Sequence, residues 1–153
     1  MRNLKRVLTI ALAAVMLVAA MAVSASAAGT KFTDVNAKDE ALYKAVTLLE
    51  GLGITKGTSD TTFGTNEDVT REQMAAFVYR LMKAGKSLEG GENNTPFEDL
   101  YDDTYYGMVS WASNQGIIKG ISATEFNPDG GITLQDAYTM LVRALGYEKD
   151  APL

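Results

Sequence analysis

The segment Gly53-Ile54-Thr55-Lys56-Gly57 returns 63 residues later as Gly116-Ile117-Ile118-Lys119-Gly120. An alignment of residues 53–82 with residues 116–145 at this offset contains nine identities in 30 positions. A duplication at a fixed period is typical of a chain built from repeated structural units. The sequence therefore predicts two copies of one unit.

Each copy has the pattern of a helix, a loop and a second helix. In copy one, apolar residues recur at helical spacing after Asp39, a suitable N-cap, and stop before Gly53, which suits a left-handed C-cap. The second helix of copy one begins with the pair Thr70 and Gln73, which has the spacing of a capping box. These patterns predict an all-α fold.

Copy two repeats this design. Its first helix is expected over about residues 104–115, and its second from Thr133 to a stop at Gly146. Phe63 and Phe126 occupy equivalent positions in the loops between the helices, and we expect both to insert into the core.

The chain begins with the features of a secretory signal peptide. Arg2, Lys5 and Arg6 precede an uncharged apolar run over residues 7–23, and small residues follow at 24–28. This order predicts export and cleavage after Ala27. The alternative is an uncleaved anchor helix, although 17 apolar residues lie at the short end for crossing a bilayer.

Composition excludes several kinds of chemistry. The chain has neither Cys nor His, so it contains no disulfide, no cysteine nucleophile and no imidazole acid or base. Without residues 1–27 it keeps 11 basic and 19 acidic residues, a net charge of −8. Such a balance argues against a nucleic-acid partner, which requires clustered basic residues.

We predict five segments along the chain. They are a signal peptide (1–27), repeat one (28–88), a linker (89–96), repeat two (97–147) and a C-terminal tail (148–153).

The motifs of both copies resemble the S-layer homology (SLH) repeat. Copy one has Phe32-x-Asp34-Val35, Gly53-Ile54-x-x-Gly57, Phe63 and Val69-Thr70-Arg71-Glu72 in the order of the family. Copy two keeps Phe97-x-Asp99, Gly116-Ile117-x-x-Gly120 and Phe126-Asn127-Pro128. The resemblance covers residues 30–147 and implies tandem helix-loop-helix repeats that form part of a pseudo-threefold bundle.

The resemblance also implies a function at the bacterial cell wall or S-layer surface. SLH repeats anchor exported proteins non-covalently by binding secondary cell wall polymers, often pyruvylated glycans attached to peptidoglycan. No enzymatic activity, cofactor, metal, nucleic acid or stable membrane insertion after cleavage is expected. Because three repeats usually form the binding unit, a third repeat in trans or a second copy of the chain is an expected partner.

Carried onto matching positions, the resemblance assigns ligand binding to seven residues: Asp34, Gly57, Thr70, Arg71, Asp99, Tyr105 and Gly120. A guanidinium pairs well with the carboxylate of a pyruvate ketal. The helix start at Thr70 would add backbone N–H donors. A groove between the copies would combine Arg71 with Tyr105, whose ring would stack on a sugar.

Copy two departs from the family pattern at Leu134, which stands where a second arginine is expected. Copy one has Glu40-Ala41 near the position of the family tryptophan. Structural roles are open for Asp34 and Asp99 as turn residues and for the two loop glycines. Trp111 is more consistent with packing than with a sugar platform.

Other functions remain open as alternatives. The chain could be a surface-layer assembly module without direct glycan binding, or the N-terminal fragment of a larger anchored protein. Carboxylate pairs such as Glu67 with Asp68, or Asp102 with Asp103, would suit glycoside hydrolysis, but no site signature supports it. Neither loop has the ligand spacing of a calcium-binding hand.

Overall fold

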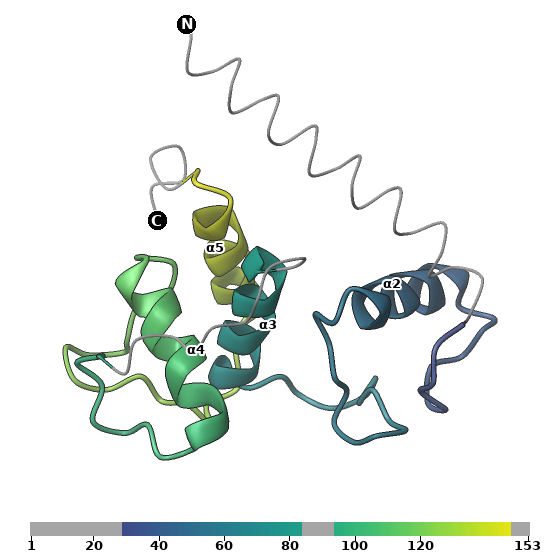
Figure 1. Cartoon of the computed structure of the whole chain (residues 1–153), viewed down its shortest axis with the longest axis horizontal. Coiled ribbons are helices and arrows are strands. Elements are labelled where there is room, and N and C mark those ends of the chain that lie inside the picture. The colour runs from purple at the N-terminus through teal and green to yellow at the C-terminus, as the bar shows by residue number, and fades with distance from the viewer. Residues whose placement is uncertain (1–28, 84–93, 148–153) are drawn as a thin grey trace, which may run out of the picture. The chain divides into compact units, whose positions relative to one another are not determined.

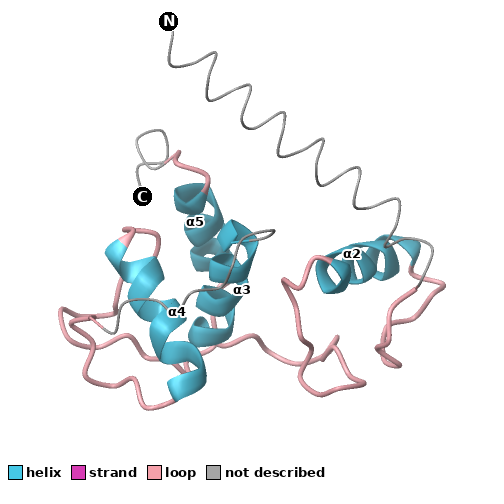
Figure 2. Cartoon of the chain, in the orientation of Figure 1, coloured by secondary structure: helices cyan, strands magenta, loops and turns pink. Residues whose placement is uncertain are grey.

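The computed structural model describes residues 29–83 and 94–147. The predicted signal peptide, most of the predicted linker and the predicted tail lie outside the described residues. Within the described residues the chain forms four helices, α2 (Glu40–Gly51), α3 (Arg71–Lys83), α4 (Asp103–Asn114) and α5 (Leu134–Ala144), and no strand (Figures 1 and 2). The all-α, helix-loop-helix prediction is therefore confirmed.

None of the helices in the described part of the chain combines the length and the apolar character needed to cross a membrane.

The helices begin where their side chains can cap them. The Asp39 carboxylate accepts a hydrogen bond from the backbone N–H of Leu42, and Thr70 and Gln73 exchange side-chain-to-backbone hydrogen bonds as a capping box. Helix α4 differs slightly from the prediction, because Asp102 rather than Thr104 marks its start and accepts from the Thr104 N–H at 2.7 Å.

The described residues divide into two compact units, and the division lies between Thr65 and Asn66. The first unit contains α2 and the loop that follows it, and the second contains α3, α4 and α5. In space, the second helix of copy one therefore belongs with both helices of copy two.

The first unit has a small apolar core under α2. Phe32, Val35 and Val46 are buried, and Phe63 packs against this cluster with its ring centre 5.8 Å from that of Phe32. The Asp34 carboxylate fixes the loop by accepting three backbone hydrogen bonds, from Phe63 at 2.7 Å, Gly64 at 2.8 Å and Thr65 at 3.2 Å. The irregular loop is thus held at its centre by one side chain.

The second unit is built around α3, which packs against both α4 and α5. Buried side chains lie on more than one face of this helix: Ala75, Ala76, Val78 and Tyr79. Phe126 is fully buried in the same core, which confirms its predicted insertion. Asp99 repeats the role of Asp34, because its carboxylate accepts from the backbone N–H groups of Phe126 and Asn127 at 2.9 and 2.7 Å.

We predict that Phe126→Ala destabilises the second unit by about 3–5 kcal/mol, because it empties a fully enclosed site. Trp111 is the single tryptophan of the chain and lies in this unit, so its fluorescence during urea unfolding reports the loss directly. Phe63→Ala is the matched control: it alters the first unit and should leave the Trp111 transition in place. Equal shifts from the two variants would contradict this account.

A second prediction concerns acid. The backbone hydrogen bond from Phe63, followed by those from Gly64 and Thr65, lowers the pKa of Asp34 below its usual value against an opposing desolvation. A lowered folded-state pKa contributes stability that is complete above the unfolded-state pKa of about 4 and is lost as the pH falls through the folded-state pKa.

Asp34→Asn should therefore lower the melting temperature at neutral pH, and the difference from the unaltered chain should shrink as the pH falls below about 4 and through the folded-state pKa. Circular dichroism melts across this pH range measure the difference. Asp60, an exposed aspartate of the same loop, provides the control, and Asp60→Asn should change little at any pH. A pH-independent deficit in Asp34→Asn would exclude the carboxylate as the cause.

Candidate ligand-binding site

Arg71, the first residue of α3, reaches the loop of copy two. Its Nε donates to the carbonyl oxygen of Phe126 at 2.9 Å, and its Nη2 donates to that of Lys119 at 2.8 Å. The guanidinium carbon also lies 4.8 Å from the centre of the Phe126 ring. Two of the five N–H donors of the guanidinium are used in these bonds, so the group is oriented and retains donors for a ligand.

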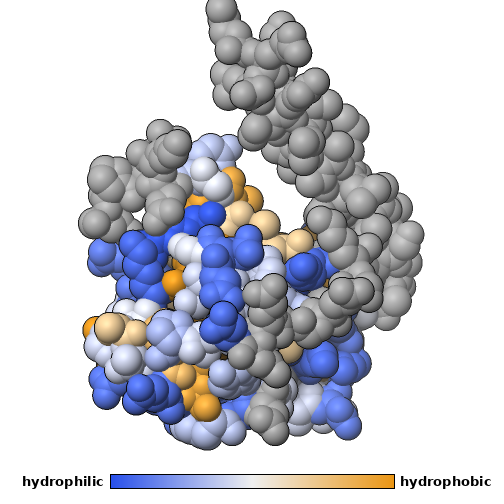
Figure 3. Space-filling model, turned by 60° about the vertical axis from the view of Figure 1, so that its left-hand side comes forward, coloured by the Kyte–Doolittle hydropathy of each residue, from blue (hydrophilic) through white to orange (hydrophobic). Residues whose placement is uncertain are grey.

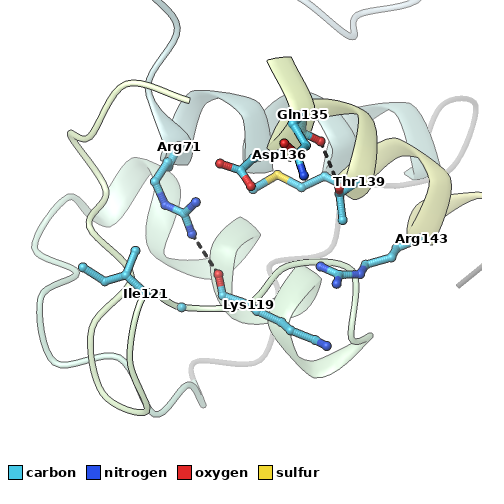
Figure 4. A pocket seen from close by; sticks show the side chains of 9 residues that line it. Arg71, Lys119, Ile121, Gln135, Asp136, Thr139 and Arg143 are labelled. Carbon is cyan, nitrogen blue, oxygen red and sulfur yellow. Dashed lines mark hydrogen bonds between the residues drawn. The ribbon is translucent and has the colours of Figure 1, made fainter. Parts of the chain in front are cut away.

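A surface hollow of about 330 Å³ lies beside this arginine (Figure 4). Its walls are Arg71, the loop residues 119–121 and five residues of α5: Gln135, Asp136, Thr139, Met140 and Arg143. The hollow is therefore lined by residues of both sequence copies. Its volume is at the lower end of the range of small-molecule sites.

The hollow has an excess of positive charge. Arg71, Lys119 and Arg143 contribute three cations, against one carboxylate from Asp136. Figure 4 shows Arg71 and Arg143 reaching into the hollow from opposite sides, with the Lys119 side chain extending below Arg143. The site thus concentrates cations in a chain that is acidic as a whole.

Burial lowers the pKa of Arg71, while the charges of Asp136 and Asp99 raise it. A guanidinium titrates so far above neutrality that Arg71 remains a cation. Asp136 is itself held in place by the Thr133 hydroxyl, which donates to its Oδ2 at 2.8 Å. This carboxylate is therefore an oriented acceptor at the edge of the hollow.

The prediction that the start of α3 offers backbone N–H donors to a ligand is wrong. The Arg71 N–H donates to the carbonyl of Gly130 at 2.9 Å, and the Glu72 N–H donates to that of Pro128 at 3.2 Å. The next donor, on Gln73, is taken by the hydroxyl of Thr70. Loop carbonyls of copy two and the cap itself occupy the positions that a ligand would need.

The other predicted site residues are distributed between the two units. Asp34 and Gly57 lie in the first unit, and Asp99, Thr70, Tyr105 and Gly120 lie in the second with Arg71. Of these six, Gly120 alone lines the hollow. A Cβ at Gly120 would overlap the Glu125 carbonyl and the Phe97 ring, so this glycine is also required by the loop itself.

Tyr105 does not line the hollow beside Arg71. It lies half-buried on α4 against the core, where burial raises the pKa of its hydroxyl, with a further raising influence from the charge of Glu72 and an opposing one from Arg80. Trp111 packs edge-on against Tyr79, with ring centres 5.1 Å apart, which confirms a packing role.

Seven of the nine lining residues were not predicted as site residues: Lys119, Ile121, Gln135, Asp136, Thr139, Met140 and Arg143. The last five lie on α5. A signal for them existed, because Asp136, Thr139, Met140 and Arg143 follow the spacing of one helix face, and Arg143 repeats Arg80 at the 63-residue offset. This spacing alone does not show whether the helix face lines a surface hollow or packs into the core.

The sequence matches the S-layer homology domain family over residues 31–75 and 96–137. Together these segments span more than half of the chain and correspond to the two copies. The chain belongs to the S-layer homology domain family, which assigns it to the bacterial cell surface.

Three relatives illustrate this membership. The chain is 35% identical over 144 residues to the middle cell wall protein of Brevibacillus brevis, covering 91% of the chain and 13% of the relative. It is 34% identical over 151 residues to a cell surface protein of Thermoanaerobacter kivui, covering 97% of the chain and 19% of the relative. It is also 35% identical over 91 residues to an endoglucanase of a Bacillus strain, covering 60% of the chain and 9% of the enzyme.

The chain thus spans less than a fifth of the length of these relatives. No solved structure gave a significant match.

The steric role of Gly120 can be tested by substitution. Gly120→Ala should destabilise the second unit by about 1–3 kcal/mol, because the backbone carbonyl and the ring it meets cannot move aside freely. Gly131→Ala, where an added Cβ meets no atom within 4 Å, should change stability by less than about 0.5 kcal/mol. Urea unfolding followed by Trp111 fluorescence compares them, and similar losses would refute the assignment.

Proposed function

We propose that the chain anchors an exported protein to the bacterial cell wall by binding an anionic secondary wall polymer in the hollow beside Arg71. The observation that carries the proposal is the oriented Arg71 guanidinium, fixed by the Phe126 and Lys119 carbonyls at one side of a cationic hollow. A guanidinium held in this way suits a planar carboxylate, such as that of a pyruvate ketal on a sugar.

The rest of the hollow suits a sugar that bears such a group. Asp136, Gln135 and Thr139 supply polar atoms for hydroxyl groups, and Ile121, with 60% of its surface exposed, supplies an apolar contact. Lys119 and Arg143 add positive charge opposite Arg71. Affinity would then depend on these local groups, because the net charge of the chain opposes a purely electrostatic attraction to an anionic polymer.

We infer a binding module without catalytic activity of its own. The repeats match a cell wall protein, a cell surface protein and, over a shorter stretch, an endoglucanase, which supports a module that accompanies different partner regions in one polypeptide. The activity of the whole protein would then reside in other segments.

Co-sedimentation with purified cell wall sacculi, before and after removal of the secondary polymer, tests the proposal. The unaltered chain should bind intact sacculi and lose binding when the polymer is stripped. Arg71→Ala should weaken binding about ten- to hundred-fold, as expected for the loss of charge-assisted hydrogen bonds.

Lys119→Ala should weaken binding to a lesser degree, since it removes a charge but not the oriented donors. Its matched control is Lys56→Ala, the equivalent exposed lysine of copy one, which should bind as the unaltered chain does. Since Arg71 also joins α3 to a loop, circular dichroism must show each variant folded. Undiminished binding by folded Arg71→Ala would overturn the proposal.

A further inference from the structure

Helix α3 contacts copy two through backbone hydrogen bonds and an aromatic pair. The backbone N–H groups of Arg71 and Glu72 bond to loop carbonyls of copy two, and the Ile132 N–H bonds to the carbonyl of Val69 at 2.9 Å. Further along the helix, Tyr79 packs on Trp111 of α4. The second helix of copy one is thereby joined to both the loop and the first helix of copy two.

Most of the same face of α5 is exposed. We define the outer face of α5 as the equivalents, at the 63-residue offset, of Arg71, Ala75, Tyr79 and Met82 of α3; they are Leu134, Tyr138, Val142 and Leu145. Ala75 and Tyr79 are buried on α3, whereas on α5 Tyr138, the equivalent of Ala75, is 59% exposed and Val142, the equivalent of Tyr79, is half-buried. Leu134 and Leu145 are 69% and 66% exposed, and Met82, the α3 equivalent of Leu145, is 37% exposed. Apolar surface appears as separate orange areas in a mostly blue surface in Figure 3.

This face also lacks the positive charge that Arg71 gives to α3. Arg71 of α3 would be matched by an arginine at the start of α5, but Leu134 stands there. An exposed leucine in place of an oriented guanidinium is unsuited to an anionic ligand and well suited to an aromatic ring. In the existing contact, that ring is Phe126, 4.8 Å from the Arg71 guanidinium carbon.

The first unit carries the complementary half of such a contact. Its described residues, 29–65, contain a loop and a first helix of the kind that receives α3 in copy two, and no second helix. Phe63, the equivalent of Phe126, is only partly buried there, and Leu48 of α2 is the equivalent of Trp111.

The sizes of the side chains are also complementary. Helix α5 has the larger Tyr138 where α3 has Ala75, and α2 has the smaller Ala45 and Leu48 where α4 has Met108 and Trp111. Ala45 is exposed. A large residue on one helix can therefore be accommodated by small residues on the other, which is what close packing requires.

We propose that the outer face of α5 binds α2 and its loop in a second copy of this chain, head to tail. The contact repeats between molecules the packing that α3 makes with copy two inside one molecule. It is heterologous, since different surfaces of the two copies meet, so each dimer keeps one free face of each kind.

Sedimentation equilibrium of residues 28–153 over a concentration series tests this contact. The unaltered chain should associate, with a mass that rises beyond that of a monomer as concentration increases. Tyr138→Glu on the outer face and Ala45→Glu on α2 should each be monomeric, because each buries a charge in one half of the contact. Both positions are exposed, so neither variant should unfold the chain.

The decisive experiment mixes these two variants in equal amounts. Each retains the half that the other has lost, so the mixture should form a dimer of twice the monomer mass and nothing larger. Ile121→Glu, an exposed apolar residue of the hollow, is the control and should associate as the unaltered chain does.

A chain that stays monomeric throughout the series would overturn the proposal, as would a mixture of variants that fails to form dimers. Continued association of Ala45→Glu alone would show that the outer face meets another outer face instead. Wall binding depends on Arg71 and is measured separately, so either proposal can fail without the other.

Discussion

The structure depends on an aspartate that holds an irregular loop by its backbone. In each copy the chain between the two helices has no regular hydrogen bonding, yet it must deliver a phenylalanine to the core. The carboxylates of Asp34 and Asp99 hold the phenylalanine in place by accepting hydrogen bonds from its backbone N–H and from that of the next residue. Charge-assisted bonds to several amides fix the loop more firmly than one neutral bond would.

Phe126 connects this constraint to the candidate site. Its N–H is held by Asp99, its ring is enclosed in the core, and its carbonyl accepts from Arg71. Phe126 therefore links the fixed loop to the Arg71 guanidinium. The position of the Arg71 guanidinium thus depends on core packing and on a carboxylate that does not line the hollow.

Local features of the fold could be predicted from the sequence, and features set by tertiary contacts could not. Asp39, Thr70 and Gln73 act on residues within one helical turn, so their capping roles follow from spacing alone. The carbonyls that occupy the start of α3 come from residues 128 and 130, almost 60 positions away. No pattern within one copy indicates that they will exclude a ligand from those amides.

The candidate site shows the same limit. Arg71 and Gly120 were predicted, because family motifs mark them, and Tyr105 was placed in the wrong environment, because the orientation of α4 decides where its ring lies. Asp136 and Arg143 were missed, since a helix face that lines a hollow has the same spacing as one that faces a core.

The sequence repeat and the compact structural unit have different boundaries. Helix α3 is encoded in copy one, yet it is buried on several sides among the helices of copy two. A repeat of this kind cannot bury its second helix alone, so its stability comes from the neighbour that follows. Both the hollow at Arg71 and the exposed face of α5 are consistent with this offset: α3 forms a hollow with the loop and second helix of copy two, and α5 presents exposed apolar residues among the described part of the chain.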